Sequence, residues 1–280
     1  MAIILALISS ALFGASDFLG GVASRRTHVL VVVGASHVVG LFLILLVTPF
    51  MADAITLRDL GIGGIAGIAG VVGITCLYHS LSRGPMAVVA PIAAVSNAAV
   101  PALWGIYSGD RLSAPPLVGV VLGLVAILLV SRVSGEETSS GTTTPGLVGV
   151  ALLSGVGFGG FFICMSLTAE ATTPWPLVSS RLVSAGIALM LLARIGRSPI
   201  PRRDEARGAI VGAGVLDITA NLAILIAVHH GMLSLVAVLG SLYPASTVLL
   251  ARYVLQERMA GTQVAGLVVA LVAIGAIVGG

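Results

Sequence analysis

Charged side chains are scarce in this sequence. Asp, Glu, Lys and Arg together make up 9% of its 280 residues, whereas they make up roughly 25% of an average soluble domain. Apolar residues make up 58%, which is more apolar surface than a soluble core of this size can bury. The shortage of charge therefore excludes a soluble globular protein and predicts a chain whose solvent is the lipid bilayer.

Three further shortages exclude other classes of protein. The fourteen basic residues are all Arg and form no basic block, the net charge is only +3, and aromatic residues make up 5%, so we expect no nucleic-acid partner. Both cysteines lie within apolar stretches, so the sequence has no disulfide framework. Cys76 and His79 are spaced to share one helix face, but two ligands without a third or fourth make a poor metal site. We expect no metal and no cofactor.

What the sequence contains instead is a series of long apolar stretches. Each is about 20 residues long, which as a helix crosses the roughly 30 Å hydrocarbon layer of a bilayer. The first has no basic segment in front of it and runs directly into the next, so we expect a membrane span there rather than a signal peptide. We predict an all-α membrane protein with ten transmembrane helices, at 3–23, 29–50, 60–82, 85–108, 115–133, 147–168, 175–194, 208–229, 232–254 and 261–279.

The second half of the sequence repeats the first. Residues 84–123 align without a gap with residues 231–270, so that Gly84 matches Gly231, Asp110-Arg111 matches Glu257-Arg258, and Gly119 matches Gly266. A repeat at about half the chain length indicates a duplicated unit. The one clearly solvated segment lies between the copies. We predict a five-helix repeat at 1–133, a polar linker at 134–145 and a second five-helix repeat at 146–280.

An odd number of helices in each copy has a geometric consequence. The second copy must enter the membrane from the side opposite to the first, so the two repeats are inverted. Inverted repeats are the usual construction of secondary transporters, whose substrate sites lie near the middle of the membrane where the halves meet.

Polar side chains inside the apolar stretches are the candidates for function. An Asp at a helix centre costs about 2.5 to 3.5 kcal/mol on insertion scales, so such side chains face the bundle interior or water. Asp217 and Asn221 are four apart and share one helix face. Ser241, Tyr243 and Pro244 interrupt the ninth stretch, where Pro frees backbone carbonyls that can line a cavity. The predicted substrate- or proton-binding residues are Asp17, His37, His79, Asn97, Arg181, Asp217, Asn221 and Tyr243.

Each candidate also has a structural interpretation. Arg181 and Asp217 would form an ion pair that neutralises both charges. Histidines in membrane helices more often join helices by hydrogen bonds than bind a ligand, and Asp17 would lie near the membrane interface.

Several local motifs carry a family resemblance. They are Phe13-Gly14-Ala15-Ser16, Asp110-Arg111-Leu112-Ser113 and Gln256-Glu257-Arg258-Met259. With these motifs the chain resembles the drug/metabolite transporter (DMT) superfamily, in particular its ten-helix EamA-type members. The resemblance implies a multi-pass protein of the cell inner (plasma) membrane that exports or exchanges small metabolites or drugs through a central cavity, driven by protons or by a counter-substrate. Asp17 also sits where the related four-helix small multidrug resistance proteins carry their membrane-embedded acid.

The orientation is left open between two indications. The loops after odd-numbered helices hold most of the Arg residues, so the positive-inside rule puts both termini outside. The family resemblance implies cytoplasmic termini.

The mechanism we expect is alternating access, with Asp17 as the proton carrier. A low-dielectric cavity would favour its protonated form, and opening of the cavity or arrival of a substrate would release the proton. Asp217 would be the second titrating or substrate-orienting group, with Arg181 as its partner. The expected partners are a small-molecule substrate, the lipid bilayer and protons, and the expected assembly is a monomer or homodimer. The alternatives are an intramembrane enzyme, for which no HExxH or other protease motif occurs, and a passive channel.

Overall fold

The fold was determined as a computed structural model, which describes residues 1–84, 86–111, 113–130, 144–201, 206–254 and 261–278. Within these ranges the chain forms eleven α-helices and one short 3-10 helix, and no strand. The helices are α1 (Ala2–Ser24), α2 (Val29–Met51), α3 (Leu57–Arg83), α4 (Met86–Tyr107), α5 (Ala114–Val130), α6 (Pro145–Ser166), η1 (Glu170–Thr172), α7 (Trp175–Arg194), α8 (Arg207–His230), α9 (Leu233–Gly240), α10 (Tyr243–Val254) and α11 (Gly261–Val278). Most of the predicted linker at 134–145 and the pair Glu257-Arg258 lie outside the described residues.

Polar residues at the breaks start the helices. The side chains of His28, Thr56 and Thr144 each accept a hydrogen bond from a backbone N–H of the helix that follows. Such caps satisfy donors that have no partner within the helix. The helices therefore begin close to the polar breaks from which the sequence predicted them.

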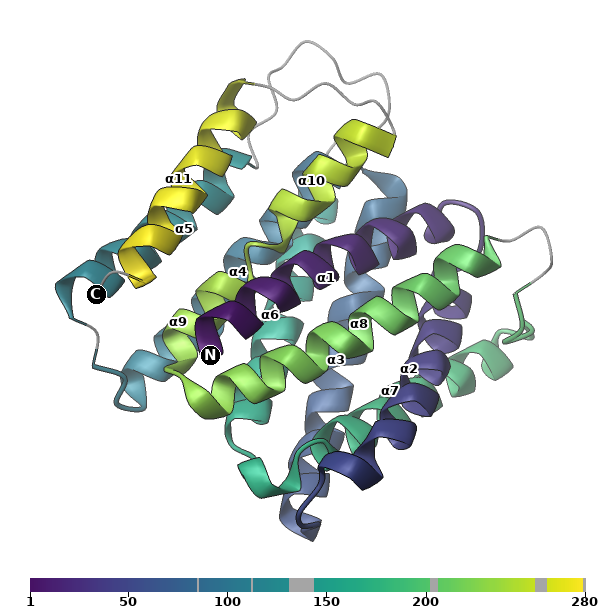
Figure 1. The fold of residues 1–280 in the computed structure, drawn as a ribbon. Helices are drawn as coiled ribbons and strands as arrows, with labels where there is room; N and C mark the ends of the chain where they lie inside the picture. Colours follow the sequence, from purple (N-terminus) through teal and green to yellow (C-terminus); the bar gives the residue numbers. More distant parts are fainter. Residues whose placement is uncertain (85, 112, 131–143, 202–205, 255–260, 279–280) are drawn as a thin grey trace.

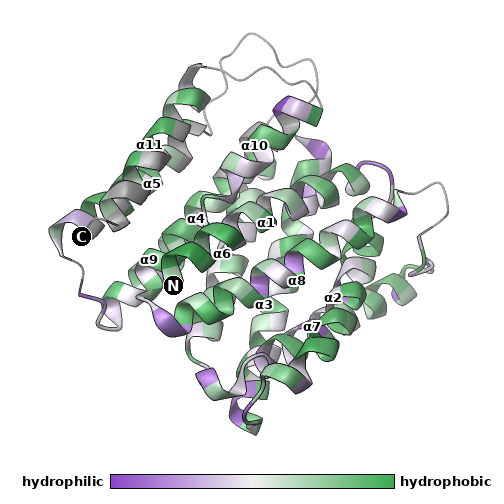
Figure 2. Ribbon diagram, viewed as in Figure 1, coloured by the Kyte–Doolittle hydropathy of each residue, from purple (hydrophilic) through white to green (hydrophobic). Residues whose placement is uncertain are grey.

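Hydrophobic residues cover the helices along their length, and hydrophilic residues gather at the turns (Figure 2). Among the described residues, seven segments are long and apolar enough to cross a membrane: α1, α2, α3, α6, α7, α8 and the pair α9 and α10 taken together. The protein is accordingly an all-helical, multi-pass membrane protein. The stretches predicted at 85–108, 115–133 and 261–279 contain α4, α5 and α11, and the count of ten crossings stays a prediction.

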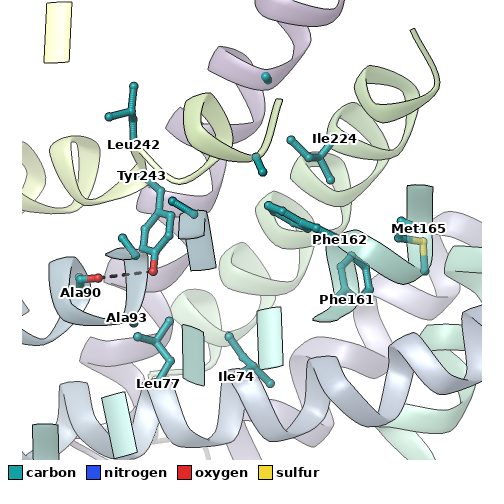
Figure 3. Close-up of a cluster of buried hydrophobic side chains, with 14 of the residues drawn as sticks. Ile74, Leu77, Ala90, Ala93, Phe161, Phe162, Met165, Ile224, Leu242 and Tyr243 are labelled. Atoms are coloured by element: carbon teal, nitrogen blue, oxygen red, sulfur yellow. Dashed lines mark hydrogen bonds between the residues drawn. The ribbon is translucent and has the colours of Figure 1, made fainter. Parts of the chain in front are cut away.

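The ninth predicted stretch is divided into two helices. Helix α9 ends at Gly240 and α10 begins at Tyr243, at the residues that interrupt the apolar run. The hydroxyl of Tyr243 donates to the carbonyl of Ala90 on α4 over 3.4 Å (Figure 3). At the start of α9, the Asp110 carboxylate accepts a hydrogen bond of 2.9 Å from the backbone N–H of Ser234. Both halves of the divided segment are therefore held by the neighbouring α4–α5 region.

The helices pack in pairs that are distant in sequence. Helix α1 lies along α8, α3 along α6, and α2 along α7. Helices α5 and α11 form a further pair to one side of the others (Figure 1). Serines on α1 reinforce the first of these contacts, because Ser9 and Ser16 each donate to a backbone carbonyl of α8 over 2.9 Å. Cys76 and Cys164 are both free and half-buried.

Candidate substrate cavity

A cavity lies among the helices and is lined by residues from both halves of the chain. It encloses about 550 Å³ of space, including the part that opens to the outside. Its lining residues come from α1, α2, α3, α4, α6, α7, α8 and α10: Phe13, Asp17, His37, Gly70, Ile74, Asn97, Phe158, Phe161, Phe162, Ser180, Arg181, Ser184, Asp217, Asn221 and Tyr243.

The structure brings seven of the eight predicted site residues to this cavity. They are Asp17, His37, Asn97, Arg181, Asp217, Asn221 and Tyr243. The eighth, His79, is half-buried on α3 and is not among the lining residues. The shared location supports treating the seven as one site, and their binding roles stay a prediction.

Arg181 and Asp217 form an ion pair in the cavity wall. A guanidinium N–H of Arg181 donates to Oδ2 of Asp217, and the two side chains are only 6% and 13% exposed. The Asn221 amide donates to Oδ1 of Asp217 over 3.2 Å and to its backbone carbonyl over 2.7 Å. A buried charge without a partner is strongly destabilising, so this arrangement stabilises both charges. Both residues of the ion pair are thus largely buried, and both line the cavity.

Asp17 is the second acid of the cavity, and it lacks such a partner. It is 5% exposed and therefore buried among the helices. Within the described ranges its carboxylate takes part in no hydrogen bond or ion pair. Its neighbour Ser16 holds α1 against α8 through the carbonyl of Ala213. The local fold thus places one unpaired acid beside a paired one.

Three more polar atoms at the cavity are buried without a partner. They are Nδ1 of His37, Oδ1 of Asn97 and Nε of Arg181. More than about 90% of buried polar groups in proteins have a hydrogen-bond partner, and leaving one unpaired costs about 1 to 3 kcal/mol. Unpaired donors and acceptors beside a cavity are therefore groups that a water molecule or a bound substrate can satisfy.

An aromatic wall completes the site. The rings of Phe13 and Phe162 lie 6.4 Å apart, and those of Phe161 and Phe162 lie 6.2 Å apart in an edge arrangement. Figure 3 shows Phe161 and Phe162 beside Met165 and Ile224. Sequence reasoning used Phe13 only as part of a motif and missed the phenylalanines of α6. The available signal was their density, since three of the seven Phe residues fall within 158–162.

Comparison with known proteins gives the following results. The sequence profile of the EamA-like transporter family matches this chain twice, over residues 1–132 and 146–279. A search of curated proteins found no match. One solved structure, titled "Crystal structure of protein", has a TM-score of 0.72 and 14% identity and covers 98% of this chain and 95% of its own. At that identity the likeness is one of fold alone.

Proposed function

Because the chain belongs to the EamA-like transporter family, we propose that it is a secondary active transporter of the DMT type. It exports or exchanges small metabolites or drugs across the cell inner (plasma) membrane. The observation that carries this proposal is the cavity between helices of both halves, with an unpaired acid and unpaired polar atoms at its wall. Such a cavity offers a binding site within the membrane.

The architecture that goes with this function is ten transmembrane helices in two inverted five-helix repeats, at 1–133 and 146–280. In this scheme α1 to α5 correspond to α6, α7, α8, the α9–α10 segment and α11. Reciprocal packing supports it: α1 lies along α8 just as its counterpart α6 lies along α3. Two helices that pack on their own counterparts, α2 on α7 and α5 on α11, support it as well. Two such repeats would provide alternating access by rocking against each other.

Asp17 is the proposed proton carrier. Burial without a counter-ion favours the neutral form of a carboxyl group, so the unpaired Asp17 would bind a proton when the cavity is closed and release it when water or a substrate reaches it. Asp217 is already paired with Arg181 and would instead orient the substrate, together with Asn221 and Tyr243. The proposed partners are a small-molecule substrate, protons and the lipid bilayer, and the proposed assembly is a monomer or homodimer.

Flux in proteoliposomes tests this function. Vesicles loaded with amino acids, nucleosides and cationic drugs would be assayed with and without a pH gradient, for the wild type, Asp17→Asn and His79→Asn. His79 is the matched control because it is a polar residue of a membrane helix outside the cavity. We expect saturable flux driven by the gradient, lost in Asp17→Asn and retained in His79→Asn.

The other outcomes identify the alternatives. Exchange that ignores both the gradient and the Asp17 substitution would mean a substrate exchanger without proton coupling. Flux that does not saturate would mean a passive channel, and hydrolysis of a substrate by the purified protein would mean an enzyme.

A further inference from the structure

Two helix crossings flank the cavity, and they are built alike. Gly67 of α3 lies against α7, where a Cβ atom on Gly67 would come within 2.5 Å of the carbonyl oxygen of Ser180. Gly214 of α8 lies against α2, where a Cβ atom would come within 2.5 Å of the carbonyl oxygen of Ser36. The shift that pairs Gly84 with Gly231, carried back without a gap along α3 and α8, also pairs Gly67 with Gly214. The two crossings are therefore equivalent contact points of the two halves.

One turn farther from the cavity, the crossings differ. On α3 that position is Gly63, where a Cβ atom would lie 2.8 Å from Cα of Pro176 on α7. Backbone contact between α3 and α7 thus continues for another turn. On α8 the matching position is Ile210, which is 1% exposed and shares a helix face with Gly214. A branched side chain there holds backbones apart where a glycine lets them meet.

A second difference lies one turn beyond Gly63, at the start of α3. Asp59 is 1% exposed, and its Oδ2 accepts hydrogen bonds from the backbone N–H of Ala169 (3.0 Å) and the hydroxyl of Thr172 (2.8 Å). Arg58 pairs with Oδ1 of Asp59 over 3.2 Å and donates to the carbonyl of Leu167 over 3.1 Å. The connection 167–174 between α6 and α7 is thereby tied to the beginning of α3.

Contacts from other elements tie the same connection down. The backbone N–H groups of Asp53 and Ala54 both donate to the carbonyl of Ala171, over 3.1 and 2.9 Å. His229, at the end of α8, has its ring nitrogens 3.3 Å from the hydroxyls of Thr168 and Thr173. The start of α3, the segment 53–54 before it and the end of α8 therefore all contact residues 167–174. We call this side of the bundle the Asp59 end.

The matching position in the second half carries no acid. One turn before Ile210 the residue is Ala206, which has no polar side chain. The glycine at position 63 and the acid at position 59 therefore both favour tighter packing in the first half than at the matching positions of the second. Gly63 and Asp59 favour close contact at the Asp59 end, whereas Ile210 and Ala206 at the matching positions of the second half are neither a glycine nor an acid.

We propose that residues 167–174 and the first turn of α3 form a gate of the transport pathway, and that Asp59 is the latch that holds it closed. This inference rests on the proposed function, because alternating access requires each end to open in turn. Opening the Asp59 end would break the bonds of Asp59 to Ala169 and Thr172. The latch, together with Gly63, biases the resting protein toward the state in which the Asp59 end is closed.

Accessibility of a cavity thiol tests the latch. Cys76 and Cys164 would be replaced by Ala, and Ser184→Cys would place a thiol in the cavity wall at little change in size. A small, charged, membrane-impermeant methanethiosulfonate would then be added from one side of the membrane at a time. Glu170→Cys in a parallel sample would identify the side on which the Asp59 end lies, since Glu170 is exposed on the gate.

We expect Asp59→Asn to raise the labelling rate from the Asp59 end about tenfold and to lower it from the opposite end, as a shift between two states requires. Thr172→Val removes one of the two donors that residues 167–174 offer to Asp59, and it should shift both rates in the same directions by less. Asp53→Asn is the matched control, because Asp53 is a nearby exposed acid whose bond to Ala171 is made by its backbone N–H, which the substitution keeps. It should change neither rate.

The latch would be ruled out by unchanged rates in both Asp59→Asn and Thr172→Val, or by rates that rise equally from both ends. Thr172→Val by itself carries the test if Asp59→Asn does not fold. Labelling needs no transported substrate, so the two proposals fail separately. Flux without a labelling response would overturn the latch, whereas a labelling response without flux would support the latch and overturn the proposed substrate transport.

Discussion

The two halves of the cavity wall occupy matching positions but carry different chemistry. On α8 the wall holds Asp217 and Asn221, and the positions that match them on α3 are Gly70 and Ile74. The first half supplies Asp17 instead, on α1 and without a partner among the described residues. One half therefore carries a neutralised ion pair, and the other carries a single unpaired acid.

After a duplication, some matching positions keep the same residue and others diverge. The crossings at Gly67 and Gly214 are alike because close helix packing is needed at both. The cavity positions differ, because Asp217 and Asn221 on α8 correspond to Gly70 and Ile74 on α3, which carry no charge.

The largest effect on stability is expected where one half has the ion pair. Arg181→Met leaves Asp217 buried and unpaired and should lower the free energy of unfolding by about 3 to 5 kcal/mol. His37→Met, at the other basic residue of the wall, should cost about 1 kcal/mol or less, because Nδ1 of His37 has no partner to lose. Unfolding in detergent measures both.

A rescue variant sharpens that comparison. The double substitution Arg181→Met with Asp217→Leu removes both charges and should recover most of the lost stability, while substrate transport stays impaired. If Arg181→Met and His37→Met lowered the free energy of unfolding by the same amount, the ion pair of the second half would not be the stronger interaction, and the comparison would fail.

An intermediate loss of stability is expected at the two equivalent helix crossings. Gly67→Ala and Gly214→Ala each push a methyl group into a backbone carbonyl of the facing helix, and each should cost about 1 to 3 kcal/mol of unfolding free energy. Gly61→Ala is the matched control, since a Cβ atom on Gly61 would meet no packed neighbour within 4 Å, and it should be neutral or slightly stabilising. A cost at only one crossing would break their equivalence.

The smallest effect is expected in the aromatic wall. Phe13→Leu removes the ring contact with Phe162, which is worth about 0.5 to 1.5 kcal/mol. It should therefore lower the free energy of unfolding by about 0.5 to 1.5 kcal/mol. Phe158→Leu should lower it less, because no ring contact of Phe158 is found within the described part of the chain. Unfolding in detergent measures both.

The sequence by itself predicted the helical membrane class and the candidate residues. The reason is that the bilayer penalises polar side chains, so any such residue in an apolar stretch must turn toward the interior. His79 shows the limit of that argument. It lies near the end of α3, close to Arg83, where the penalty is weaker and a polar side chain need not reach the cavity.

Only the tertiary structure decided which residues meet. That Asp217 pairs with Arg181 while Asp17 stays unpaired, that three phenylalanines of α6 line the site, and that Asp59 binds the connection 167–174 all depend on how helices far apart in sequence pack. A polar residue in a membrane helix must turn away from the lipid or find a hydrogen-bonding or charged partner, and this can be read from the sequence. Its partner is set by helix crossings such as those at Gly67 and Gly214, whose geometry results from the packing of many side chains at once.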